Sequence, residues 1–249
     1  MESQPGSKMY ASTVQRRGDE VIRPAGPWTP AVHRLLRQLA DVAGLDGVPR
    51  PLRVDHPDSE VVSFVPGTVP AYPMPCWVWS RAALVSAAVY LRRLHDATVG
   101  VHQAGPWRSP VHQPEEVICH NDFAPYNLVF DAGRVVGAID WDFASPGPRL
   151  WDLAYLAYRI VPLSTADWGD GLDADARSDR LHALLEAYGS TATSEALLEV
   201  LERRLLELAD YSDAAADERG AELHEHAALY RRDAGRLADL TRNRTDRTD

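Results

Sequence analysis

The order of apolar and polar positions divides the chain into a short β-rich beginning and a longer helical remainder. Before residue 66, β-branched and alternating runs separated by turn residues predict strands at 10–15, 20–23, 49–54 and 60–65. A single predicted helix lies between the second and third of these strands. It begins at Thr29, the predicted N-cap, has Pro30 in its first helical position and continues to about Val42.

Beyond residue 66 the apolar residues mostly follow a helical period. Ser80 is the predicted N-cap of a helix that continues to about Thr98, and a buried helix is predicted from Leu150 to Ile160. Three more helices are predicted at about 178–188, 194–214 and 215–240.

This pattern predicts an α+β fold with two lobes. The small N-terminal lobe, residues 1–66, combines a β-sheet with one helix, and the C-terminal lobe, residues 67–240, is mainly helical. The polar end, residues 241–249, is predicted to be disordered. A chain of 249 residues is long enough to bury a core in this arrangement.

Composition and charge narrow the possible partners. The formal net charge of −10 disfavours nucleic acid, and no apolar run is long enough to span a membrane. The first ten residues lack the apolar centre of a signal peptide, so a cytoplasmic location is expected. The only two cysteines, Cys76 and Cys119, are expected to be buried thiols rather than a disulfide framework. The oligomeric state is left open.

Most of the chemically capable residues lie between Val117 and Asp152. His120, Asp122 and Asn127 follow a short apolar run in the pattern H-x-D-x-x-x-x-N. Two β-rich segments come next, separated by Asp-Ala-Gly, which is typical of a hairpin turn, and the second segment leads into Asp140. This order of loop, hairpin and acidic residue is that of a kinase-type phosphoryl-transfer site.

The spacing has a chemical reason. An attacking hydroxyl needs an acceptor for its proton, and the Asp122 carboxylate can serve as that acceptor. Magnesium prefers hard oxygen ligands, which the Asn127 carbonyl and the Asp140 carboxylate offer. A hairpin would bring these two side chains together although they lie thirteen positions apart. His120 is expected to brace the loop through hydrogen bonds.

The segments HNDFAPYN, IDWD and PRLWDLAY resemble motifs of the aminoglycoside phosphotransferase family, also called the phosphotransferase enzyme family. The resemblance implies a protein-kinase-like fold, ATP or GTP as co-substrate and Mg²⁺ as cofactor. It makes Asp122 the catalytic base, Asn127 and Asp140 the metal ligands, and Asp152 a structural residue. Asp142 is either a support of the site or an exposed loop carboxylate.

In the small lobe the resemblance is weaker. Arg23 is at the position where the family presents a phosphate-binding lysine, although an exposed strand residue is the alternative. The Ser63 carbonyl and the Val65 amide match the linker that binds adenine. Only Gly6-Ser7-Lys8 remains of a glycine-rich loop, and the helix at 29–42 contains no glutamate to orient a lysine. Both the lysine and the glutamate of the usual Lys–Glu pair are therefore missing.

The acceptor is predicted only by class. Residues 164–222 contain fifteen Asp or Glu and five Arg, and in the family helices of this region line the acceptor pocket. An acidic wall would attract a cationic acceptor such as an aminoglycoside, but exposed acidic helices are also ordinary in globular proteins.

The leading hypothesis is a Mg²⁺-dependent phosphotransferase that moves the γ-phosphate of ATP or GTP to a small-molecule hydroxyl, with antibiotic resistance as one role. The degenerate small lobe supports an alternative, a weakly active or inactive binding or immunity protein. A Ser/Thr kinase of a peptide natural-product precursor is a third possibility.

Overall fold

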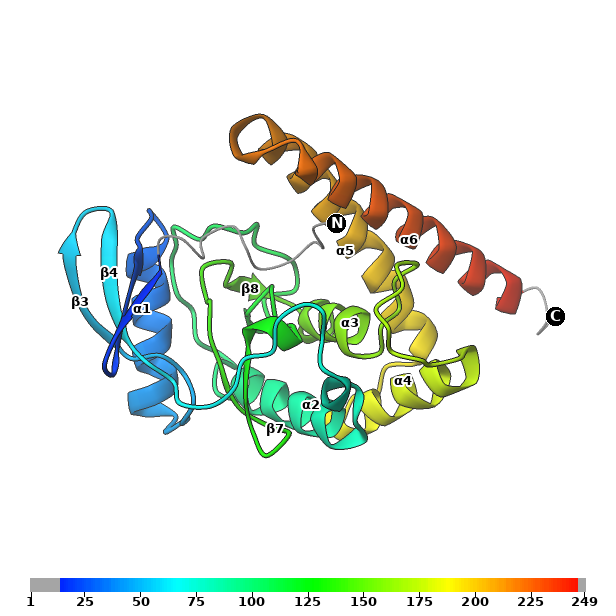
Figure 1. Cartoon of the computed structure of the whole chain (residues 1–249), viewed down its shortest axis with the longest axis horizontal. Coiled ribbons are helices and arrows are strands. Elements are labelled where there is room, and N and C mark those ends of the chain that lie inside the picture. Colours follow the sequence, from blue (N-terminus) through cyan, green and yellow to red (C-terminus); the bar gives the residue numbers. More distant parts are fainter. Residues whose placement is uncertain (1–13, 246–249) are drawn as a thin grey trace.

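The first described part of the chain is an antiparallel sheet with one helix beside it. In the computed structural model, which describes residues 14–245, the strand order is β1-β2-β4-β3. The strands are β1 (Gln15–Arg17), β2 (Glu20–Pro24), β3 (Pro51–His56) and β4 (Ser59–Ser63). Helix α1 (Thr29–Arg37) and a π-helical turn η1 (Gln38–Val42) follow β2 and lie against this sheet (Figure 1). The strand predicted at 10–15 lies mostly outside the described residues.

Helix α1 buries the apolar side chains that the periodicity predicted. Leu35 and Leu36 are almost inaccessible to solvent. The predicted N-cap was wrong by one residue, because Trp28 occupies that position. Thr29 instead uses its hydroxyl to accept a hydrogen bond from the Gly26 amide at 3.0 Å.

A short linker after β4 joins the sheet to the rest of the molecule. Thr68 exchanges two backbone hydrogen bonds with Phe130, each 2.8 Å long. Gly67 precedes this contact with a φ of +140°, and a Cβ atom there would come within 2.5 Å of the Val129 side chain. Only glycine allows the linker to approach β6 this closely.

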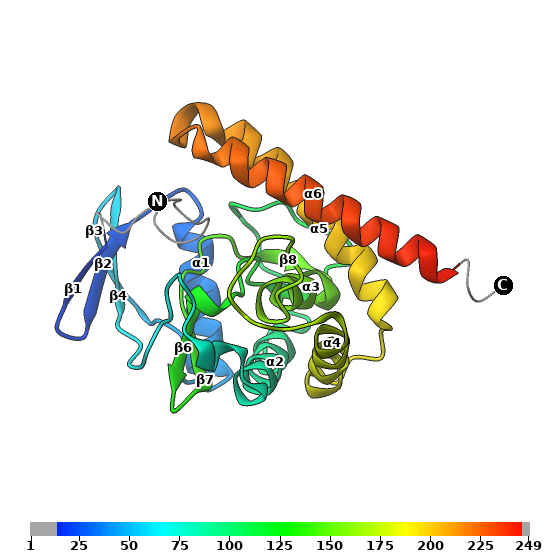
Figure 2. The ribbon, with the colours of Figure 1, turned by 45° about the vertical axis from the view of Figure 1, so that its right-hand side comes forward.

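The remaining elements surround one apolar core. They are η2 (Cys76–Trp79), α2 (Arg81–Asp96), β5 (Val117–Cys119), η3 (Pro125–Asn127), β6 (Leu128–Asp131), β7 (Arg134–Ala138), β8 (Ser145–Gly147), α3 (Arg149–Ile160), α4 (Ala174–Tyr188), α5 (Ser194–Arg219) and α6 (Glu222–Thr245). Strand β5 pairs with β8, and β6 pairs with β7. Helix α3 lies near the middle of the molecule, α2 packs against both α3 and α4, and α6 runs back along α5 on the outside (Figures 1 and 2). Strand β5 packs against both α2 and α3, and α3 packs against α5.

Two sequence expectations need correction, and a third stays untested. Helix α6 continues through Thr245, so the tail expected to be disordered from residue 241 is helical over 241–245. Cys76 is exposed, whereas Cys119 is buried as expected. The division at residue 66 into two domains stays a prediction. None of the helices described between residues 14 and 245 is long and apolar enough to cross a bilayer.

Candidate active site

The loop between β5 and β6 holds Asp122 in a defined orientation. Its Oδ1 accepts a hydrogen bond from the Tyr126 hydroxyl at 2.7 Å, and its Oδ2 accepts one from the Asn127 amide at 2.8 Å. Loss of hydration raises the pKa of Asp122, although the Tyr126 hydrogen bond opposes this shift. A carboxylate with a raised pKa is a better proton acceptor, and this one is half-buried in the wall of a cavity.

Asp152, from α3, holds this loop from inside the protein. The fully buried carboxylate accepts hydrogen bonds from the backbone amides of His120 and Asn121, at 2.7 and 2.9 Å. His95 contacts it at 3.2 Å. The resulting loop conformation includes a positive φ of 62° at Asn121. His120 adds a contact from its Nε2 to the Ile139 carbonyl at 3.0 Å, which joins the loop to the end of β7.

His95, Cys119 and Asp152 also form a close group of potential metal ligands, with donor atoms within 4.8 Å of one another. The Asp152 oxygens already accept backbone hydrogen bonds, and His95 contacts the Tyr188 hydroxyl at 2.6 Å. We therefore interpret this group as a hydrogen-bonded support for the loop.

The β6–β7 hairpin brings Asn127 and Asp140 together. Leu128 pairs with Ala138, and the Ile139 amide donates to the Asn127 carbonyl at 2.9 Å. Asp140 follows with a φ of +61°, and 46% of its side chain is exposed. Asn127 turns its amide nitrogen to Asp122, which leaves its side-chain oxygen for a cation. One carbonyl and one carboxylate oxygen on the two sides of a hairpin fit the ligand preference of Mg²⁺.

Arg23 is held by three carboxylates. Its Nε donates to Glu60 at 3.0 Å, its Nη1 lies 3.5 Å from Asp140, and its Nη2 contacts Asp142. The side chain is only 13% exposed, so the alternative of an exposed strand residue was wrong. Burial acts to lower the pKa of Arg23, but the three carboxylates outweigh it and raise this pKa, so the guanidinium stays charged.

Glu60 and His33 are the two members of this cluster that the sequence did not indicate. Arg23 and Glu60 are direct cross-strand partners in β2 and β4, and Glu60 also contacts His33 of α1. Burial alone would raise the pKa of Glu60, but the His33 hydrogen bond and the Arg23 charge lower it. The carboxylate that faces Arg23 therefore comes from the neighbouring strand, and α1 contributes a histidine to the same cluster.

We expect Glu60→Gln to lower the free energy of unfolding by about 1–3 kcal/mol, because it leaves the buried Arg23 and His33 with a weaker partner. Urea denaturation would measure this change. The matched control is Glu20→Gln, which removes an exposed ion pair with Arg53 on the same sheet and should change stability little. Equal effects of the two substitutions would contradict the role given to the buried cluster.

Asp142 lies beside Arg23 and is not an exposed loop residue. Its side chain is 13% exposed, and besides Arg23 it has Arg108 Nη1 at 3.8 Å. Burial raises the pKa of Asp142, and the Arg23 charge acts against this shift. The alternative of an exposed loop carboxylate was therefore wrong, and the supporting role of Asp142 stays a prediction.

The linker residues Ser63 and Val65 lie in the wall of the same cavity. The backbone hydrogen bonds of this linker come from the Ser63 and Phe64 amides, which donate to the Arg50 and Asp19 carbonyls at 2.9 and 2.7 Å.

One cavity of about 1470 Å³ collects most of the predicted site residues. Its lining includes Arg23, Ser63, Val65, Asp122, Asn127, Asp140 and Asp142. This volume exceeds the roughly 300–1,000 Å³ of a pocket for one small ligand. His120 and Asp152 do not line the cavity. The residues 6–8, expected as a remnant glycine loop, lie outside the described part.

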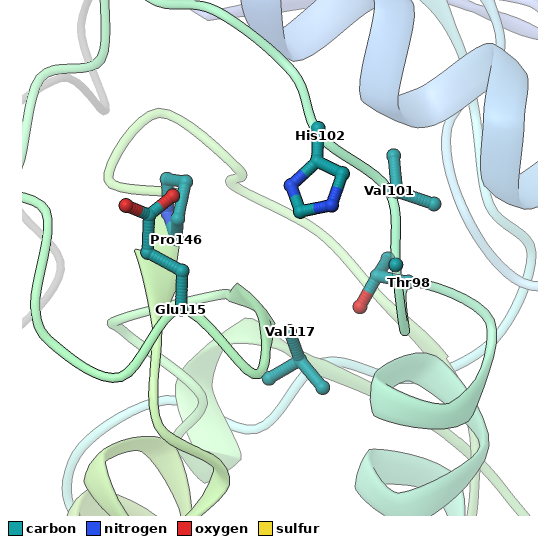
Figure 3. Close-up of a pocket in the computed structure, with 7 residues that line it drawn as sticks. Thr98, Val101, His102, Glu115, Val117 and Pro146 are labelled. Carbon is teal, nitrogen blue, oxygen red and sulfur yellow. The ribbon is translucent and has the colours of Figure 1, made fainter.

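A second, much smaller cavity lies elsewhere. It measures about 10 Å³ and is lined among others by Thr98, His102, Glu115 and Pro146 (Figure 3). That space holds about one water molecule, so we assign no ligand to it.

Comparison with known proteins identifies the family. Residues 105–196 match the family model of the phosphotransferase enzyme family. The trifolitoxin immunity protein of Rhizobium leguminosarum bv. trifolii is 33% identical over 189 residues, which cover 72% of this chain and 70% of the relative. The chain belongs to the phosphotransferase enzyme family. The resemblance carried by HNDFAPYN and IDWD is thereby confirmed.

Several solved structures similar to this family member are named as kinases or phosphotransferases. A choline/ethanolamine kinase family protein from Mesorhizobium loti is 19% identical with a TM-score of 0.63, and the match covers 90% of this chain and 84% of that one. Amicoumacin kinase with AMP-PNP, Ca²⁺ and its ligand is 13% identical with a TM-score of 0.63, covering 90% and 88%. An aminoglycoside phosphotransferase from Streptomyces rimosus with ADP and streptomycin is 18% identical with a TM-score of 0.53, covering 74% and 85%. These matches confirm the predicted kinase-like α+β fold.

Proposed function

We propose that this protein transfers the γ-phosphate of ATP or GTP to a hydroxyl group of a small molecule in the cytoplasm. The observation that carries the proposal is the single cavity in which Asp122, Asn127, Asp140 and Arg23 meet. No residue of this set is isolated: each contacts another member of the set or a residue that holds one.

Each side chain then has a role. Asp122 accepts the proton of the acceptor hydroxyl while the new O–P bond forms and the bond to the β-phosphate breaks, which releases a nucleoside diphosphate. Asn127 and Asp140 hold Mg²⁺, which when bound neutralises charge on the phosphates. Arg23 binds the phosphates as a fixed cation. The Ser63 carbonyl and the Val65 amide bind the nucleotide base.

The relatives suggest the kind of acceptor. One of these structures is named amicoumacin kinase, and another is an aminoglycoside phosphotransferase with streptomycin bound, so we propose a hydroxylated natural product for this chain as well.

A second candidate is an immunity protein that binds a compound without phosphorylating it. Two observations favour it: the relative at 33% identity is named an immunity protein, and three carboxylates already surround Arg23. In this function the cavity would bind the compound, and nucleotide would be unnecessary.

Calorimetric titration with ATP and GTP, each with and without Mg²⁺, separates the two functions. We expect Mg²⁺-dependent binding that becomes at least about tenfold weaker in Asp140→Asn, because a metal ligand loses its charge. The matched control is Asp131→Asn, which changes an exposed aspartate in the turn of the same hairpin and should bind nucleotide normally. Folded protein that binds neither nucleotide at millimolar concentration would instead support the immunity function.

A further inference from the structure

Two buried arginines line the cavity on the side of the helical elements. Arg159 is the penultimate residue of helix α3, which ends at Ile160, and Arg204 belongs to α5. Their exposed fractions are 5% and 3%, yet both contribute to the wall that also holds Asp122.

Arg159 is surrounded by phenol groups. Its Nε and Nη2 donate to the Tyr155 hydroxyl at 3.2 and 3.0 Å, and Nη2 also donates to the Tyr230 hydroxyl at 3.1 Å. Burial raises the pKa of Tyr155 far above neutral pH, so this partner is uncharged. Among the described residues no carboxylate oxygen lies within 4.0 Å of the Arg159 guanidinium.

Arg204 is only partly satisfied. Its Nη1 donates to the Asn121 side chain at 3.4 Å and its Nη2 to the Asn121 carbonyl, but its buried Nε has no hydrogen-bond partner. The guanidinium lies 4.6 Å from the centre of the Tyr155 ring. Its charge helps to lower the pKa of Asp152, although it forms no ion pair within 4.0 Å in the described part of the chain.

A buried cation without a carboxylate partner is costly, and an anionic ligand would offset that cost. Two other arginines of the cavity differ in this respect, because Arg23 and Arg108 both contact the carboxylate of Asp142. Over residues 14–245, neither Arg159 nor Arg204 has a carboxylate oxygen within 4.0 Å of its guanidinium.

The position of the arginines favours the acceptor over the nucleotide. Three successive contacts lead from Asp122 to Arg159: 2.7 Å to the Tyr126 hydroxyl, 2.9 Å on to the Tyr155 hydroxyl and 3.0 Å to the guanidinium. A small molecule bound at Arg159 can therefore reach the carboxylate that would accept its hydroxyl proton.

We propose that Arg159 and Arg204 form an anion subsite and that the acceptor is a hydroxylated carboxylic acid. This inference rests on the proposed phosphotransfer, and it replaces the cationic acceptor that the acidic helices suggested. Of those acidic residues, Glu207, Asp210 and Glu222 line the cavity. These carboxylates could pair with an amino group of the same acceptor. An aminoglycoside, however, has no carboxylate that the arginines could bind.

The test compares carboxylates with their uncharged carboxamides. Calorimetry without nucleotide would use 4-hydroxyphenylacetate, N-acetylserine and a serine-containing tetrapeptide with a free C-terminus, each beside its amide. Streptomycin is the cationic probe. Preferred binding of the hydroxy acids would indicate a small acceptor, and preferred binding of the tetrapeptide would indicate the C-terminus of a peptide. We expect at least one carboxylate to bind about tenfold or more tightly than its amide.

Substitutions then assign this preference to the arginines. Arg159→Gln should reduce it to less than about twofold, and Arg159→Lys should retain part of it because the charge remains. Arg134→Gln, an exposed change on the β6–β7 hairpin, is the matched control. Arg204→Gln also removes hydrogen bonds to Asn121, so this variant could fail to fold. In that case, the comparison of Arg159→Gln with Arg159→Lys still tests the proposal.

Three results would overturn the proposal: equal binding of acids and amides, no binding of any carboxylate at millimolar concentration, or a preference that persists in Arg159→Gln. Its failure is separable from failure of the proposed function. Nucleotide binding without a carboxylate preference removes only the subsite. A carboxylate preference without nucleotide binding keeps the subsite and removes the phosphotransfer.

Discussion

Asp122→Asn should reduce the rate of phosphate transfer by about 10²–10⁴-fold, the usual contribution of a general base. The amide keeps the size of the side chain but cannot take the proton of an attacking hydroxyl. Tyr126 and Asn127 still have a polar partner, so the loop should keep its conformation. ADP release with an identified acceptor measures the rate, and calorimetry checks that nucleotide affinity is unchanged.

Stability provides an independent check on the same variant. Because the pKa of Asp122 is raised in the folded protein, the folded state binds its proton more tightly than the unfolded state does. Wild-type stability should therefore fall as pH rises from about 4 through that raised value, and Asp122→Asn should lack this loss. Asp131→Asn, at an exposed position, is the control. Full activity in Asp122→Asn would remove Asp122 from the role of base.

Asp152→Ala should lower the free energy of unfolding by about 3–5 kcal/mol, the usual effect of removing one member of a buried charged group. The substitution leaves the buried amides of His120 and Asn121 without their acceptor and takes away a partner of His95. Urea denaturation would measure the change. The matched control is Asp131→Ala on the exposed turn, which should change stability little.

The pH dependence of Asp152 has the opposite sign to that of Asp122. Burial acts to raise the pKa of Asp152, but the His95 hydrogen bond and the charges of His95, His120 and Arg204 outweigh it and lower this pKa. Its stabilising effect is present above about pH 4 and is lost as pH falls through the lowered value. Asp152→Ala should therefore show a smaller loss of stability with acid than the wild type. Identical acid profiles would contradict this account of the loop.

Local elements of the site followed from the sequence because short-range geometry determines them. Ser80 caps α2 as predicted, since its hydroxyl accepts from the Ala83 amide at 3.1 Å. Asp131 to Arg134 form the expected turn, and the hairpin register then brings Asn127 beside the residues before Asp140. Hydrogen-bond partners a few residues apart leave the backbone few alternatives.

The partner of Arg23 could not be predicted in the same way. The absence of a glutamate from the helix at 29–42 suggested an incomplete site, whereas Glu60 faces Arg23 from β4. The signal that could have found it is the register between two strands that are far apart in the sequence. A shift of one residue in that register would place Glu60 on the other face of the sheet.

By itself, the sequence determined the family, the kinase-like α+β fold and the order of loop, hairpin and acidic residue around Asp122. Tertiary structure alone decided the contacts between distant elements: Arg23 with Glu60, and Arg204 with the Asn121 loop. Residues 37 and 83 positions apart meet only after strands and helices have packed. Side-chain periodicity tells which face of an element is buried, but the partner across that face depends on the packing of the whole chain.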